Sequence, residues 1–154
     1  MASSTSSPAL LNDRLAHRLG VAGRLLRTTA DAELSVVGLS GPGLAVLRSL
    51  SEEDGLTQAE LARRLRLEPP SMCRMIDRLA REDSVERHPD PADRRATRVR
   101  LTPGGRTLAE RGTAVIGGIE ERIFAGLDAD ERDQLAELLQ RVMDRLPASG
   151  PAPL

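Results

Sequence analysis

Residues 97–101 restrict the fold more than any other segment, because they carry a strand-like alternation in a chain of mostly helical patterns. Their sequence, TRVRL, alternates β-branched or apolar residues with arginine, as a strand with one buried face does. Val85 begins an earlier stretch that can pair with it. Residues 88–96 lie between the two and contain several Pro and Asp residues, which favour turns. The sequence therefore predicts a β-hairpin.

The other apolar patterns have helical spacing. Thr57 and Glu60 form a capping-box pair, in which each side chain satisfies a backbone N–H of the other residue, and this predicts a helix start. Pro70 suits the first position of the next helix, where a missing N–H has little cost. The predicted helices lie near residues 10–34, 44–50, 57–65, 70–81, 103–127 and 128–146.

The order of these elements predicts the fold class. Two short helices at a tight turn, followed by a hairpin, make a winged helix-turn-helix, here at about residues 40–101. The fold is therefore mainly α with a small β-hairpin wing. The helices at 10–34 and 103–146 have apolar faces too large for so small a domain to cover, which predicts that they are dimerisation helices of a homodimer. The predicted division is a disordered N-terminus at 1–9, one domain at 10–146 and a disordered C-terminus at 147–154.

Composition excludes several classes of protein. Aromatic residues make up only 1% of the chain, so binding by stacking on bases is not expected. With one Cys and two His, there is no basis for a disulfide, a metal cluster, a cofactor site or a nucleophile–base pair, and we expect no enzyme. No apolar run approaches the ~20 residues that span a bilayer. The N-terminus lacks a secretory-signal pattern, so a cytoplasmic location without a membrane partner is expected.

Positive charge is concentrated in the middle of the chain. Residues 60–106 contain 12 Arg against 8 acidic residues, a balance of +4, although the whole chain has a net charge of −1. A basic segment is the electrostatic pattern expected of a protein that binds a polyanion.

The run LTQAELARRLRLEPPSMCRMIDRLAREDSVERHPDPADRRATRVRLTPGGRTL, residues 56–108, resembles the MarR family of bacterial transcriptional regulators. Its most specific part is DPADRR followed by RVRLTPGG, which resembles the wing signature of the family. The resemblance implies a dimeric DNA-binding regulator, usually a repressor, that is often released from DNA by a small molecule. The sequence departs from the usual family pattern at four positions, which are Arg66, Pro70, Asp83 and Ser84.

The helix at residues 70–81 is the predicted recognition helix. Arg74 points away from its apolar stripe and is predicted to read guanine through a bidentate contact in the major groove. Ser71, Cys73 and Arg78 lie on the flanks and are predicted to contact phosphates or base edges. Pro70 has no N–H, so we expect weaker phosphate capture at this helix end than in a helix that starts with Ser.

A carboxylate at Asp77 on this face would repel phosphates unless a cation neutralised it. The family resemblance suggests a salt bridge between the helix and the wing, and Arg95 is the predicted partner. Arg94 would then enter the minor groove, although the two arginines could exchange these roles. Asp90 and Asp93 are predicted to orient the two guanidinium groups. Two copies would read a pseudo-palindromic operator in double-stranded DNA.

Three further interpretations remain open. The resemblance implies an aromatic or phenolic effector between the dimerisation helices and the DNA-binding lobe, and Arg14, His17 and Arg24 could reach such a cleft, although they could equally be ordinary surface residues. Cys73 lies beside Arg74 near the start of the recognition helix, where a thiolate would be favoured, so a redox-responsive regulator is an alternative. A winged-helix interaction module that does not bind DNA is another.

Overall fold

A computed structural model describes residues 8–93 and 96–146, and side chains from residue 14 onward in this range. The elements, in chain order, are α1 (Pro8–Val36), α2 (Gly41–Glu52), β1 (Leu56–Thr57), α3 (Gln58–Arg64), α4 (Pro69–Arg81), β2 (Val85–Pro89), β3 (Thr97–Leu101), α5 (Pro103–Ile123) and α6 (Ala129–Met143). The predicted mainly helical winged helix-turn-helix is confirmed. Helix α1 begins before residue 10, and residues 1–7 and 147–154 of the predicted disordered ends lie outside the described part.

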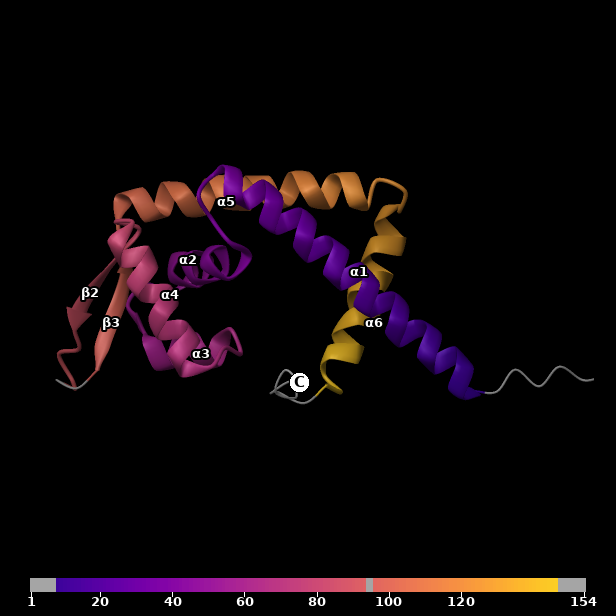
Figure 1. Cartoon of the computed structure of the whole chain (residues 1–154), viewed down its shortest axis with the longest axis horizontal. Helices are drawn as coiled ribbons and strands as arrows, with labels where there is room; N and C mark the ends of the chain where they lie inside the picture. Colours follow the sequence, from indigo (N-terminus) through magenta and orange to yellow (C-terminus); the bar gives the residue numbers. More distant parts are fainter. Residues whose placement is uncertain (1–7, 94–95, 147–154) are drawn as a thin grey trace, which may run out of the picture.

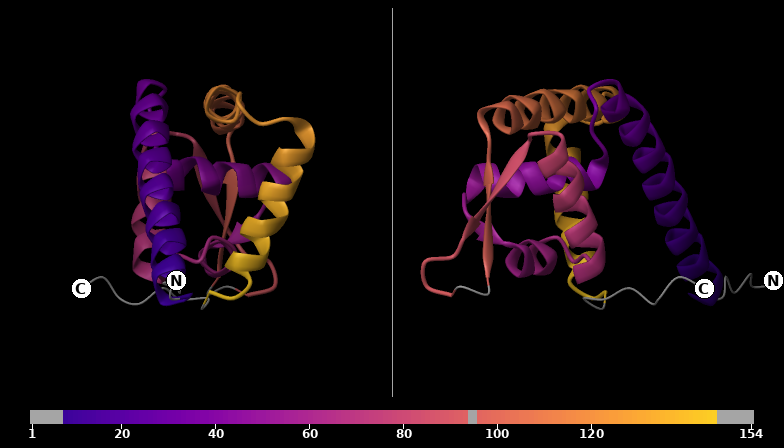
Figure 2. Two further views of the ribbon diagram at one scale, coloured as in Figure 1. Left: turned by 90° about the vertical axis from the view of Figure 1, so that its right-hand side faces the viewer. Right: turned by 60° about the vertical axis from the view of Figure 1, so that its left-hand side comes forward.

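The molecule has a winged-helix lobe at one end and the terminal helices at the other. Helices α2, α3 and α4 pack with the sheet, and α5 runs from this lobe along the edge of the molecule (Figure 1). Helix α1 packs against α2 and α5. Away from this contact, α1 and α6 leave α5 on separate paths, as the two views in Figure 2 show.

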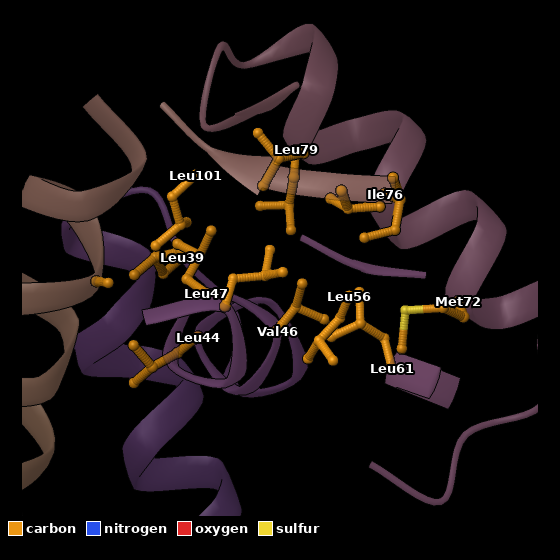
Figure 3. Packing of buried hydrophobic residues seen from close by; sticks show 14 of the residues in the cluster. Leu39, Leu44, Val46, Leu47, Leu56, Leu61, Met72, Ile76, Leu79 and Leu101 are labelled. Carbon is orange, nitrogen blue, oxygen red and sulfur yellow. The ribbon is translucent and has the colours of Figure 1, made fainter. Parts of the chain in front are cut away.

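The core is aliphatic, as the near absence of aromatic residues requires. Helix α2 lies at its centre, with Val46, Leu47 and Leu50 all fully buried. Figure 3 shows side chains from α3, α4 and the sheet around it, including Leu61 and Ile76. One continuous cluster therefore holds the helix-turn-helix and the sheet together, and it fixes the orientation of α4.

The sheet has three antiparallel strands in the order β1–β3–β2, one more than the predicted hairpin. Val85 pairs with Leu101 across the predicted hairpin, and Leu56 pairs with Val99 on the other side of β3. Strand β1 has only two residues, and the second, Thr57, is also the N-cap of α3. A strand this short has no periodicity to detect, which explains why the sequence did not reveal it.

The start of α4 differs by one residue from the prediction. Glu68 is the extended N-cap residue, and both Pro69 and Pro70 lie inside the first turn. Proline is tolerated there because the first N–H groups of a helix have no partner within the helix. The predicted capping box between Thr57 and Glu60 is confirmed, with both hydrogen bonds present.

Three helices end in a residue with left-handed backbone geometry. After α1 this residue is Gly38, with φ of 80°, but after α3 and α4 it is Arg66 and Asp83, with φ of 52° and 54°. In each case the amide of the following residue donates to a carbonyl five residues earlier, the hydrogen bond of a Schellman motif. A side chain disfavours this geometry, so Arg66 and Asp83 are strained relative to Gly.

Replacing Arg66 or Asp83 with Gly is therefore expected to raise the free energy of unfolding by about 0.5–1 kcal/mol, because relief of strain exceeds the entropy gained by the unfolded chain. Urea denaturation measures the change. Arg63→Gly, in the right-handed last turn of α3, is the matched control and should lower stability by about 1 kcal/mol. Equal losses in all three variants would contradict the argument.

Candidate DNA-binding surface

The recognition helix α4 has one buried and one exposed face. Met72, Ile76 and Leu79 are fully buried in the core. The opposite face carries Arg74, which is exposed and donates to the Ser71 hydroxyl at 3.2 Å. The spacing of the apolar stripe predicted this division, and the structure brings Arg74 and Ser71 together as candidate DNA-binding side chains.

The first turn of α4 offers no free backbone N–H for a phosphate. Pro69 and Pro70 have none, and the amides of Ser71 and Met72 both donate to the carbonyl of Glu68 at 3.0 Å. Anion binding at a helix N-terminus requires unpaired N–H groups. Any DNA contact by this turn would therefore come from side chains, in agreement with the weak phosphate capture expected from Pro70.

Asp77 joins the recognition helix to the wing hairpin. Its carboxylate accepts from the Arg87 guanidinium of β2 at 2.6 Å, with about half of the Asp77 side chain exposed. The predicted partner, Arg95, lies outside the described residues, as does Arg94. A helix-to-wing ion pair is thus present at Asp77, with Arg87 as a partner that sequence reasoning missed. Neutralising this carboxylate removes a charge that would repel the phosphate backbone.

Cys73 lies on the exposed face next to this pair. Its thiol is 3.9 Å from the Asp77 carboxylate, whereas the Arg74 guanidinium donates to Ser71. Any bulky modification of the thiol would disturb this surface. The described contacts, however, place a carboxylate rather than a cation against the sulfur.

A second ion pair lies where β2 passes into the loop of the wing. The Asp90 side chain is only 8% exposed and accepts from Arg98 of β3 at 2.9 Å and from the Ala92 amide at 2.9 Å. Arg98 also donates to the Gly55 carbonyl at 2.8 Å, which connects the wing to the turn before β1. Asp90 was predicted to orient Arg94 and Arg95, whose structure is not described. Its contacts with Arg98 and Ala92 show that it anchors the hairpin itself.

The pKa of the Asp90 carboxyl lies below its ordinary value, because the Ala92 N–H and then the Arg98 guanidinium stabilise the ionised form. Its stabilising effect is therefore present above the unfolded-state pKa of about 3.9 and is lost as the pH falls through the lower folded-state pKa. Asp90→Asn should be less stable than the wild type at pH 7. In urea denaturation, this difference should shrink below about pH 4. A difference independent of pH would show that charge at Asp90 is not involved.

Arg78 was predicted to contact DNA; in the structure its side chain is 40% exposed and its guanidinium bonds to another helix. One terminal nitrogen donates to the Ser40 hydroxyl at 2.9 Å, and the Nε atom is buried. Ser40 is the N-cap of α2, so this contact joins the two helices.

The predicted effector residues do not line a described groove. Arg14, His17 and Arg24 are all exposed on α1. One open groove of about 590 Å³ lies between α2 and α5, and another of about 280 Å³ lies between α5 and α6. Neither groove, nor the open groove of about 880 Å³ along the end of α6, includes any of the three residues.

Neither a metal nor a membrane is indicated by the described residues. Within residues 8–93 and 96–146, no cluster of three or more His, Cys, Asp or Glu side chains could hold a metal ion. In the same ranges no single helix could cross a membrane. The segments Arg14–Val36 and Gly41–Glu52 have the length and apolar composition of a membrane span only when taken together, and they are bent by 75° relative to each other. Much of α2 is buried in the core, which accounts for its apolar composition.

Comparison with known proteins places this surface in a family. The MarR family model matches residues 39–97. The HTH-type transcriptional repressor Rv2887 of Mycobacterium tuberculosis is 33% identical over 120 residues, which cover 78% of this chain and 86% of that protein. A mutant of Escherichia coli MarR, solved with operator DNA, has a TM-score of 0.79 and 28% identity, with 92% of this chain and 100% of that chain covered.

A third similar structure contains a small molecule. CouR from Rhodococcus jostii RHA1, bound to p-coumaroyl-CoA, has a TM-score of 0.76 and 25% identity, with 89% of this chain and 96% of that chain covered. The identity to Rv2887, the family-model match and the likeness in fold all agree with the helix-turn-helix and wing described above. The chain belongs to the MarR family of transcriptional regulators.

Proposed function

We propose that the protein is a homodimeric transcriptional repressor that binds a pseudo-palindromic operator in double-stranded DNA through α4 and the wing. The observation that carries the proposal is the exposed face of α4, where Arg74 and Ser71 lie next to a carboxylate neutralised by the wing hairpin. The E. coli MarR structure with operator DNA has the same fold. The protein would act where its operator lies, in the cytoplasm.

Exposed apolar side chains support the homodimer. Helix α6 has no buried residue, and Leu34 is the only buried residue of α1 from residue 14 onward. Large apolar side chains on both helices are 41–84% exposed. They are Leu15, Leu19, Leu25, Leu26 and Val36 on α1, and Leu138, Val142, Met143 and Leu146 on or just after α6. Patches of this kind in a folded chain mark interaction surfaces, and a second copy would cover them.

The proposed DNA contacts divide between two grooves. Arg74 would read guanine in the major groove, with Ser71 and Cys73 on its flanks. Arg94 and Arg95, which lie between β2 and β3 in the sequence, would reach the minor groove or its phosphates. In a two-fold dimer, these contacts repeat at half-sites about one helical turn apart.

The experiment is a DNA titration at several salt concentrations, with a duplex selected from random sequences by the wild-type protein. Arg74→Ala is expected to cost about 1–3 kcal/mol and to relax specificity at one base pair. Replacing Arg94 and Arg95 together with Ala should also flatten the dependence of log K on log salt, by about one for each phosphate that is no longer neutralised. Arg111→Ala, an exposed residue on α5, is the control and should change neither quantity.

The outcomes separate the competing functions. A winged-helix interaction module would show no steep salt dependence with any duplex. If the Arg94/Arg95 variant matched the wild type in affinity and slope, the proposed role of the wing would be wrong. Peroxide treatment of the wild type and of Cys73→Ser, before the same titration, tests whether oxidation of Cys73 controls binding.

Release by a small aromatic or phenolic effector is part of the proposal. The support comes from CouR, whose structure holds an aromatic acyl-CoA. Candidate acids and their thioesters can be added to the protein–duplex complex, with release followed by fluorescence anisotropy. Release of the wild type, with weaker release of Arg14→Ala or Arg24→Ala, would support these residues as part of the site in the dimer.

A further inference from the structure

The Arg78 side chain extends from α4 toward the N-terminus of α2. Its terminal nitrogen donates to the Ser40 hydroxyl at 2.9 Å and lies 3.6 Å from the Met75 sulfur. The Nε atom is buried, without a hydrogen bond among the described residues, and its distance to the Glu82 carboxylate is 3.8 Å. With 40% of the side chain exposed, the guanidinium is held at the junction of two helices.

The N-terminus of α2 forms the binding position for this guanidinium. Ser40 accepts from the Gly43 amide at 3.3 Å as the N-cap of α2, and the same hydroxyl accepts from Arg78. A Cβ atom at Gly43 would lie 3.2 Å from the Arg78 nitrogen, closer than ordinary van der Waals contact. Gly43 therefore leaves the space that the guanidinium occupies.

The same helix end is tied to α1. The Asp31 carboxylate of α1 accepts from the Gly41 amide at 3.1 Å. The first turn of α2 thus receives a contact from a terminal helix and another from the recognition helix. A side chain that bonds here connects α4 to the part of the molecule from which the terminal helices extend.

We propose that Arg78 is a positioning residue, which fixes the orientation of α4 by its bond to Ser40 and does not itself contact DNA. The inference rests on the proposed DNA-binding function. Ser40 bonds one terminal nitrogen of the guanidinium, and drawing the group away from α2 toward a phosphate would lose this charge-assisted hydrogen bond. Held at Ser40, Arg78 keeps α4 at a set angle to α2, so that Arg74 and the wing engage the duplex together.

The salt dependence of DNA binding distinguishes positioning from phosphate contact. Arg78→Met keeps the aliphatic stem and removes the guanidinium. We expect it to lower affinity for the selected duplex about tenfold, the size of one hydrogen bond to a charged group, with an unchanged slope of log K against log salt. A phosphate contact would instead reduce the slope by about one.

Substitutions of Ser40 and Gly43 on α2 test the same hydrogen bond. Ser40→Gly keeps most of the capping preference but removes the acceptor, and Ser40→Thr keeps the hydroxyl. Affinity should fall about tenfold in Ser40→Gly and recover in Ser40→Thr. The double variant Ser40→Gly/Arg78→Met should lose no more than either single variant, because both remove one bond. Gly43→Ala should also weaken binding, by displacing the guanidinium.

Urea denaturation identifies any variant that fails to fold. If Arg78→Met does not fold, Gly43→Ala tests the Arg78–Ser40 hydrogen bond in its place. The inference is overturned if Arg78→Met reduces the salt slope, or if Ser40→Gly and Gly43→Ala both bind like the wild type. The proposed function fails separately, if the wild type shows no salt-dependent binding to any duplex.

Discussion

Gly105→Ala is expected to destabilise the protein by about 3 kcal/mol or more, at the upper end of the range for overpacked sites. An added Cβ would lie 1.8 Å from the carbonyl oxygen of Ser84, so backbone must move. That carbonyl accepts from the Thr102 amide at 3.2 Å, and the Thr102 hydroxyl donates to the Asp83 carbonyl. Separating these segments would detach the start of α5 from the end of α4, and the wing would lose its support.

Gly104→Ala is the matched control for this prediction. Its added Cβ would have its nearest neighbour, the Asp83 carbonyl oxygen, at 3.6 Å, an ordinary contact. Stability should be unchanged or higher by about 0.5 kcal/mol, because the unfolded chain loses freedom. Urea denaturation compares the two variants. If both are equally stable, the close approach at Ser84 does not constrain the fold.

Leu138→Glu is expected to convert the homodimer into a monomer. Leu138 is 47% exposed on α6, and a carboxylate there would be buried in the proposed interface of each protomer. A cost of about 2 kcal/mol for each copy would raise the dimer dissociation constant about a thousandfold. Operator affinity should fall with it, because one recognition helix and one wing would have to bind alone.

Gln140→Glu adds the same charge on the polar face of α6, where Gln140 is exposed and hydrogen bonded to Asp144. It should remain dimeric apart from a small loss in helix stability. Sedimentation velocity at micromolar concentration measures the mass of each variant. A dimeric Leu138→Glu protein would show that this face of α6 is not in the interface.

The sequence predicted those parts of the fold that depend on local periodicity. The alternation at residues 97–101 identified β3, and the apolar stripes and capping box identified the helices. The exposed face of α4 followed from helical geometry alone, so Arg74 was placed correctly on it, with Ser71 half-buried on its flank. Arg66 and Asp83, which stand where the family pattern commonly has Gly, both have left-handed backbone geometry in the structure.

Side-chain partners distant in sequence were not predictable in the same way. Asp77 could pair with any arginine of the hairpin, and only the path of β2 past α4 brings Arg87 within 2.6 Å. Arg98 has the alternating position of a surface residue, yet it bonds Asp90 across the wing. Arg78 bonds Ser40, 38 residues earlier, a contact that depends on how two helices cross. Periodicity shows which face a residue lies on but not which residue it meets.

The central claim is that two copies bind one duplex, each through α4 and its wing. Light scattering of the purified complex with the selected duplex measures the number of chains directly. The account predicts two chains on one duplex, with inverted half-sites about 10 base pairs apart between centres. A tight complex with one chain per duplex, or no complex with duplex DNA in dilute buffer, would contradict it.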